Sequence, residues 1–315
     1  MDWGLGSKGW TAVDCGDSAA LCAVSVRTAV RPGQRPEVVA ALEQPTETGA
    51  ADTEALREML ARAPRGMPLL VTLPRAQYGL RVMPEPAVQP REMANSLRWS
   101  ISVDSDDPSA EINLAWMRIP TEERMPTRPK HLYAITTPTA ALTAQLAAWR
   151  PAGLRPKVVD IRETALRNIA AALEHPDEAL ALVAADAEGV GFVFTFQGAL
   201  YLDRYISQPV SELASADDAA RGRAYDRIAQ QLNRSIDAVH RSYPFMTIKR
   251  VVVAPMPDRP GLPKWLAAQA SVPVEGLNLE QVVDMTAVPQ LAESPALQAR
   301  CLVALGAALR GVKAD

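Results

Sequence analysis

The chain has 315 residues, of which 48% are hydrophobic and 22% are charged, and its formal net charge is −3. This composition is typical of a folded globular protein with two lobes, and the near-neutral charge argues against nucleic acid as a partner. No apolar stretch approaches the roughly 18 residues that a membrane span requires. The cysteines, Cys15, Cys22 and Cys301, form no CxxC pair, so the composition predicts a cytoplasmic protein without a membrane span.

The first part of the chain is predicted to open with three strands joined by turns, over residues 10–14, 21–26 and 37–42. Leu56, Met59 and Leu60 follow helical spacing and predict a helix over 52–63. A short strand over 69–73 completes this unit. The pattern indicates an α/β lobe.

The segment 74–130 has a different texture and is predicted to be an inserted α+β subdomain. It is expected to contain a strand at 79–83, a helix at 91–102 and a strand at 111–118. The first lobe is then expected to resume with a strand at 132–136, a helix at 140–149, a strand at 157–161 and a helix at 163–173. These assignments place the whole first lobe at 1–176.

The remainder, 177–315, repeats the opening pattern and is predicted to form the second lobe. Strands are expected at 180–185, 191–196 and 199–206, followed by a long helix over 223–243 with one apolar stripe of Ile228, Leu232, Ile236 and Val239. A strand at 250–254, a helix at 262–269 and a strand at 272–275 follow. Prolines 289 and 295 are taken as connections. The final helix, 296–310, is apolar on most sides and is expected to pack back on the core. Two similar halves predict a duplicated α/β architecture with a central cleft.

Five stretches of sequence carry a resemblance to a known family. They are GWTAVDCG at 9–16, EMANSLRW at 92–99, LRPKVVDI at 154–161 with ALRN at 165–168, QLNRSID at 231–237, and ALGAALR at 304–310. Together they resemble the PilM-like proteins of type IV pilus assembly, and most closely the MshI family of MSHA pilus biogenesis. The resemblance implies an actin-like fold, which is a duplicated ribonuclease-H-like architecture of two lobes with an inserted subdomain in the first.

The resemblance also implies a role and a partner. Such a protein is a cytoplasmic scaffold, peripheral at the inner membrane, that works with other components of the pilus platform. Its partner is a PilN- or MshJ-like bitopic membrane protein, whose cytoplasmic tail docks between the first subdomain and the inserted one.

Aromatic and apolar side chains of the inserted subdomain are candidates for this groove, since a tail would insert apolar anchors. The alternative is that they build the small core of the subdomain or, for the arginine, lie on an exposed helix position. The candidates are Leu80, Met83, Arg98, Trp99 and Trp116.

The nucleotide elements of an actin-like ATPase are only partly present. Asp14, Gly16, Asp17 and Ser18 resemble the first phosphate loop, although a polar hairpin turn explains the same residues. At the second loop, where relatives have Asp-x-Gly, the chain reads AAD at 184–186. At the adenosine element it reads APMPD at 254–258, where glycine would be needed for close backbone approach.

These departures predict a pseudo-ATPase without catalytic residues or a bound cofactor, with magnesium ATP as the remaining alternative. The three histidines, His131, His175 and His240, are dispersed, so no metal site is predicted. Two other functions stay open: a working nucleotide-dependent ATPase of the same fold, and a cytoplasmic L-type component of a type II secretion system.

Overall fold

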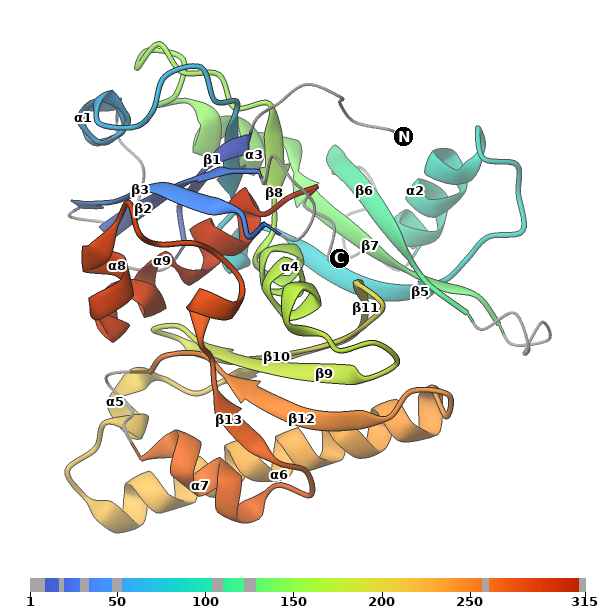
Figure 1. Ribbon diagram of the computed structural model, residues 1–315. Coiled ribbons are helices and arrows are strands. Elements are labelled where there is room, and N and C mark those ends of the chain that lie inside the picture. The colour runs from blue at the N-terminus through green and yellow to red at the C-terminus, as the bar shows by residue number, and fades with distance from the viewer. Residues whose placement is uncertain are drawn as a thin grey trace.

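The computed structural model describes residues 9–16, 20–28, 34–46, 53–103, 110–121, 129–256 and 261–311. It contains two five-stranded mixed sheets stacked across a layer of helices, and a smaller three-stranded sheet to one side (Figure 1).

The first sheet has the strand order β3-β2-β1-β4-β8. Strands β1 (Gly9–Asp14), β2 (Ala20–Arg27) and β3 (Glu37–Pro45) are antiparallel, whereas β4 (Leu69–Thr72) and β8 (Val158–Asp160) extend the sheet in parallel from β1. Helix α1 (Thr53–Ala61) and Trp149, which follows α3 (Thr139–Leu146), bury apolar side chains against one face of this sheet.

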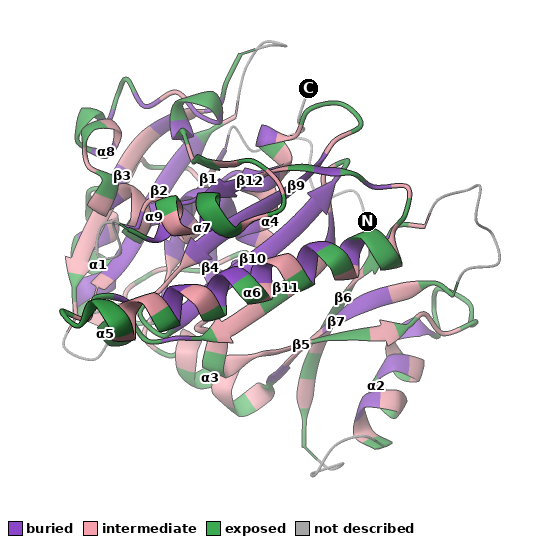
Figure 2. Cartoon of the chain, turned by 90° about the horizontal axis from the view of Figure 1, so that it is seen from below, coloured by how far each residue is buried: buried purple, intermediate pink, exposed green. Residues whose placement is uncertain are grey.

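The second sheet repeats this plan with the order β11-β10-β9-β12-β13. Strands β9 (Ala179–Ala185), β10 (Gly189–Phe196) and β11 (Ala199–Ser207) are antiparallel, and β12 (Ile248–Val253) and β13 (Val274–Gly276) follow in parallel. Its outer face is covered by α6 (Asp218–Ser242), with α7 (Leu262–Gln269) beside it and the short α5 (Val210–Leu213) before it. The predicted apolar stripe of α6 is confirmed, because all four of its residues are buried; Figure 2 shows buried and exposed residues alternating along the helix.

The two halves exchange helices in the layer between the sheets. Helix α4 (Arg162–Leu173), from the first half, packs on β9, β10 and β11 of the second sheet. Helix α9 (Pro295–Ala308), preceded by α8 (Pro289–Glu293), packs on β1, β2 and β4 of the first sheet and crosses α4 (Figure 1). The expected burial of this final helix is confirmed, since eight of its residues are buried.

The inserted subdomain has the strand order β5-β7-β6 with one helix, α2. Its elements are β5 (Gly79–Pro84), α2 (Met93–Val103), β6 (Ile112–Ile119) and β7 (His131–Pro138). The boundary predicted at residue 130 needs correction, because β7 is the middle strand of this sheet and not the first strand of the resuming lobe. Strand β7 pairs with β5 on one side and with β6 on the other, and it thereby joins these two strands in one sheet.

Candidate functional site

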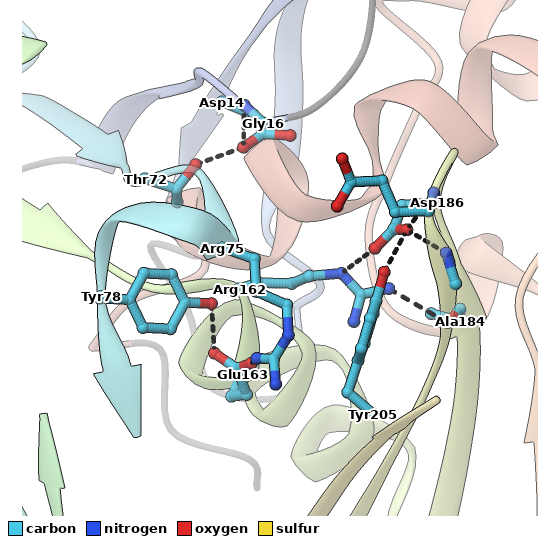
Figure 3. Close-up of polar contacts among 12 residues, drawn as sticks. Asp14, Gly16, Thr72, Arg75, Tyr78, Arg162, Glu163, Ala184, Asp186 and Tyr205 are labelled. Atoms are coloured by element: carbon cyan, nitrogen blue, oxygen red, sulfur yellow. Dashed lines mark hydrogen bonds and ion pairs between the residues drawn. The ribbon is translucent and has the colours of Figure 1, made fainter. Parts of the chain in front are cut away.

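The expected nucleotide cleft begins at the turn between β1 and β2. Asp14 Oδ1 accepts a hydrogen bond from Thr72 Oγ1 at 2.5 Å and another from the backbone N–H of Gly16 at 3.2 Å. The carboxylate is thus held against β4 and its own turn (Figure 3). Asp17 and Ser18, which were predicted for the same phosphate loop, lie outside the described residues.

Cys15 follows Asp14 and is buried in the core that α1 shares with the first sheet. Burial, and then the negative charge of Asp14, raises the pKa of its thiol to about 12, although a hydrogen bond with Gln145 acts in the opposite direction. The thiol is therefore protonated at neutral pH, which fits a packing role and not a nucleophile.

The turn between β9 and β10 is organised by Asp186. Its Oδ1 accepts hydrogen bonds from the backbone N–H groups of Glu188 and Gly189, at 2.9 and 2.8 Å, and from Tyr205 Oη at 2.7 Å. Successive backbone N–H groups are the donors with which a phosphate loop holds its anion. Here a carboxylate of the chain itself receives them.

Arg162, the first residue of α4, reaches this same turn. Its Nη2 donates to the carbonyl oxygen of Ala184 at 3.1 Å, and its Nε lies 3.4 Å from Asp186 Oδ2. The side chain is only 8% exposed. A Cβ added at Gly191 would lie 2.5 Å from Arg162 Nη1, so the guanidinium lies directly against the backbone of β10 as well as β9.

A second ion pair connects α4 to the segment that leads into the inserted subdomain. Arg75, in a short 3-10 helix (Arg75–Gln77), places Nη1 2.5 Å from Glu163 Oε1. Tyr78 Oη donates to Glu163 Oε2 at 2.7 Å, and the Glu163 side chain is only 1% exposed. Both oxygens of this buried carboxylate are therefore engaged by residues next to the insertion.

Tyr205 on β11 connects the two ion pairs. Its hydroxyl donates to Asp186, and its ring centroid lies 4.4 Å from Arg75 Cζ and 5.8 Å from Arg162 Cζ (Figure 3). Guanidinium groups are attracted to the negative face of an aromatic ring at such distances. We refer to six residues as the interlobe clamp: Arg75, Tyr78, Arg162, Glu163, Asp186 and Tyr205.

Asp203, also on β11, lies close to the clamp. Removal from water, followed by the negative charge of Glu163, raises the pKa of its carboxyl to about 7, although nearby guanidinium groups oppose the rise. Its backbone N–H donates to Tyr133 Oη at 3.1 Å. Because Tyr133 lies on β7, this bond gives the inserted subdomain a direct contact with the second sheet.

The segment after β12 is where an actin-like ATPase would hold the adenosine. Ala254 and Met256 are buried, and Pro255 between them has no N–H to donate. Pro257 and Asp258, the rest of the predicted degenerate element, lie outside the described residues.

The contacts around Asp186 do not fit a magnesium nucleotide at the turn between β9 and β10, which we call the second hairpin. The amides of Glu188 and Gly189 already donate to Asp186, and the Arg162 guanidinium fills the adjoining space. A phosphate there would have to displace the carboxylate that those amides hold and would separate Arg162 from its ion-pair partner Asp186.

Two of the three strand residues predicted for a partner groove, Leu80 and Met83, lie on opposite faces of the small sheet. Leu80 packs against the main core, whereas Met83 packs against the small core beneath α2. The cause is the alternation of side chains along β5, which sends positions of odd separation to opposite faces. Trp116 lies on the edge strand β6 and is 37% exposed. The structure therefore does not bring Leu80 and Met83 to one face, and a single groove lined by both residues is not present.

The two helix residues lie away from the small core. Met93, Leu97 and Ile101 form the face of α2 that packs on the sheet. Trp99 is 70% exposed on another face, so it lies outside that core. Arg98 Nη1 donates to the carbonyl oxygen of Ile112 at 2.6 Å, which ties α2 to the beginning of β6.

A groove of about 700 Å³ does lie where the inserted subdomain meets the first lobe. One wall is the segment just before β6, and the other is the exposed face of α3, where small side chains recur at helical spacing. The residues that line it include Ala110, Glu111, Ala140, Thr143, Ala144 and Ala147.

The part of the chain that the structure describes shows no group of three or more His, Cys, Asp or Glu residues able to hold a metal ion. None of the described helices is long and apolar enough to cross a membrane.

The two similar sheets, the exchanged helices and the inserted subdomain define the class: this is an actin-like ATPase fold, as predicted. A chain of the PilM–PilN type IV pilus biogenesis complex is similar with a TM-score of 0.72 and 23% identity, over 97% of this chain and 99% of that chain. The fold is thus PilM-like.

Two further solved structures are less similar. One is the cytoplasmic domain of EpsL, an inner-membrane component of the type II secretion system of Vibrio cholerae, with a TM-score of 0.48 and 13% identity over 87% of this chain and 92% of that chain. The other is a Bacteroides thetaiotaomicron protein of unknown function with an actin-like ATPase fold, with a TM-score of 0.45 and 8% identity over 91% and 97%. No family model and no curated protein matches the sequence.

The interlobe clamp was not predicted from the sequence. Its one local signal is the pair Arg162-Glu163 at the expected start of a helix, but charges at helix ends are usually solvated. Only the fold places the beginning of α4 between the two lobes, where both side chains become buried.

Proposed function

We propose that the protein is a non-catalytic scaffold of a type IV pilus assembly platform, located at the cytoplasmic side of the inner membrane through its partner. The observation that carries the proposal is the likeness to a chain of the PilM–PilN complex, which extends over nearly the whole of both chains. The five stretches that together resemble the MshI family most closely favour an MSHA-like system within this class.

The proposed scaffold is a pseudo-ATPase that needs no cofactor. Support comes from three places in the cleft. Asp14 accepts hydrogen bonds from Thr72 and from its own turn, and the second hairpin holds the Asp186 carboxylate. Pro255 interrupts the segment after β12, where an ATPase of this fold would hold the adenosine. Asp14 and Asp186 are thus each held by hydrogen bonds from neighbouring groups of the chain, at the two turns where an ATPase of this fold would bind phosphates.

The proposed partner is the cytoplasmic tail of a PilN- or MshJ-like bitopic membrane protein, and its proposed site is the groove beside α3. Small side chains at Ala140, Ala144 and Ala147 let a bound backbone approach the helix closely, which favours an extended or helical segment with apolar side chains. Glu111 at the opposite wall favours a basic residue in that tail.

A fluorescence-anisotropy titration tests this proposal with a labelled synthetic peptide that carries the cytoplasmic tail of a PilN-like protein. Ala144→Trp fills the groove with an indole, and we expect it to weaken binding at least about tenfold, or 1.4 kcal/mol. Ala268→Trp is the matched control, because Ala268 is an equally exposed alanine on α7.

The same titration with Trp99→Ala separates the groove from the exposed face of α2. Unchanged affinity for Trp99→Ala together with lost affinity for Ala144→Trp supports the groove. Wild-type affinity for Ala144→Trp contradicts it, and a peptide that does not bind the wild-type protein contradicts the proposed partner class.

A further inference from the structure

Asp186 acts as an anion built into the second hairpin. Its carboxylate receives two successive backbone N–H groups of its own turn and the hydroxyl of Tyr205. A phosphate loop offers its ligand the same kind of donors. The hairpin is therefore organised around a negative charge that is covalently part of the chain.

Arg162 supplies the positive charge that this carboxylate needs. It comes from α4, which begins immediately after the last strand of the first sheet, and it contacts the backbone of β9 through Ala184. The absence of a side chain at Gly191 makes room for its guanidinium. A buried charge of this kind is tolerated only when it is paired and hydrogen-bonded.

The contacts continue from α4 to the base of the inserted subdomain. Glu163, adjacent to Arg162, binds Arg75 and Tyr78, which directly precede β5. Tyr205 of the second sheet packs against the Arg75 guanidinium. The second sheet, α4 and the base of the insertion are thus joined by one continuous set of polar contacts (Figure 3).

We infer that the interlobe clamp fixes the two lobes and the inserted subdomain relative to one another without a nucleotide, with Asp186 and Arg162 in the place of a bound phosphate and its counterion. The inference rests on the proposed absence of a working nucleotide site. It deepens that proposal, because a scaffold that binds no nucleotide needs another device to hold its lobes in one arrangement.

Distance measurements between two spin labels test the inference on the full chain. Glu58→Cys on α1 and Ala268→Cys on α7 place one exposed label on each lobe, and the three native cysteines are buried, so labelling is selective. We expect one narrow distance distribution for the otherwise wild-type protein, unchanged by magnesium ATP. Arg162→Ala should broaden or displace it.

Arg227→Ala is the matched control, because it removes an ion pair with Glu212 that lies entirely within the second lobe. Its distribution should stay narrow. If Arg162→Ala does not fold, the double variant Arg162→Met with Asp186→Asn removes both charges together and keeps an acceptor oxygen in the turn. The same broadening is expected.

A folded Arg162→Ala protein, or the folded double variant, with the wild-type distribution overturns the clamp and leaves the scaffold proposal standing. A shift of the wild-type distribution by magnesium ATP contradicts the proposed pseudo-ATPase, and the inference falls with it. The two failures are therefore distinguishable in one set of samples.

Discussion

Arg162 and Asp186 illustrate why a charged pair in this position is costly to disturb. Removing one partner of a buried ion pair lowers the free energy of unfolding by roughly 3–5 kcal/mol, because the other charge stays in the interior without a partner. Arg162 is almost fully buried, whereas Asp186 keeps some contact with solvent. Removing Asp186 leaves the more deeply buried charge, Arg162, without its partner. The loss of Asp186 is thus expected to lower the free energy of unfolding more than the loss of Arg162.

Asp203 makes the stability of the protein depend on pH. Its pKa in the folded protein, about 7, lies above the ordinary value of 3.8, so the folded state keeps a proton that the unfolded chain has lost. The associated stability is complete below about pH 4 and is lost as the pH rises to about 7. Over that window the free energy of unfolding should fall by up to about 1.4 kcal/mol per pH unit.

Asp203→Asn should reduce this slope to the part contributed by other groups such as Glu174, whose pKa burial also raises, and urea unfolding at intervals between pH 4.5 and 7.0 will measure the difference. Asp237→Asn, an exposed aspartate on α6, is the control and should keep the wild-type slope. If the slopes of Asp203→Asn and the wild-type protein coincide, the proton is not held at Asp203.

At the scale of single residues, the sequence predicts little of the site. Asp14 and Gly16 could be put forward as phosphate-loop candidates, because they lie in a short motif at the end of a strand. Arg75, Glu163 and Tyr205 were not, because they meet only through tertiary contacts and no spacing along the chain relates them. Trp99 shows the converse: its helix was predicted, but its exposure depends on how α2 is rotated on the sheet.

Among the elements, the crossing of α4 and α9 depends on one small residue. A Cβ added at Gly306 would lie 2.2 Å from the carbonyl oxygen of Ala165, a backbone atom that cannot give way without moving the helix. Asn168 Nδ2 donates to the Gly306 carbonyl oxygen at 2.8 Å and fixes the same crossing.

We therefore expect Gly306→Ala to lower the free energy of unfolding by about 1–3 kcal/mol, the usual cost of overpacking a core. Chemical denaturation will show this. Gly222→Ala on α6 is the control, because its added methyl group would meet only Trp265 at 3.6 Å, and it should stabilise by about 0.5–1 kcal/mol. A Gly306→Ala protein as stable as wild type would show that the two helices can separate freely.

Most elements were predictable, since alternation and helical spacing are local signals. The strand at 132–136 is predicted by its pattern, but its place in the middle of the small sheet is not, because strand periodicity does not specify which strands pair. Helix α8 was missed for a different reason. Pro289 and Pro295 were read as connections, but each occupies the first turn of a helix, where the missing N–H of proline costs no hydrogen bond.

For the whole molecule, the repeated order of strands was enough to predict two lobes, and the structure confirms the actin-like fold. The exchange of α4 and α9 between the halves could not be predicted, because the apolar pattern of a helix does not specify which sheet it packs on. That exchange matters for the account, since it is α4 that brings Arg162 and Glu163 between the lobes.

The arrangement of the two lobes in this actin-like molecule is proposed to be independent of nucleotide. Thermal unfolding with a concentration series of magnesium ATP tests it most directly, because a ligand present at a hundredfold its Kd stabilises by about 2.7 kcal/mol. We predict no shift of Tm up to millimolar ATP beyond that produced by magnesium and inorganic phosphate. A rise in Tm that saturates with ATP concentration would contradict the account.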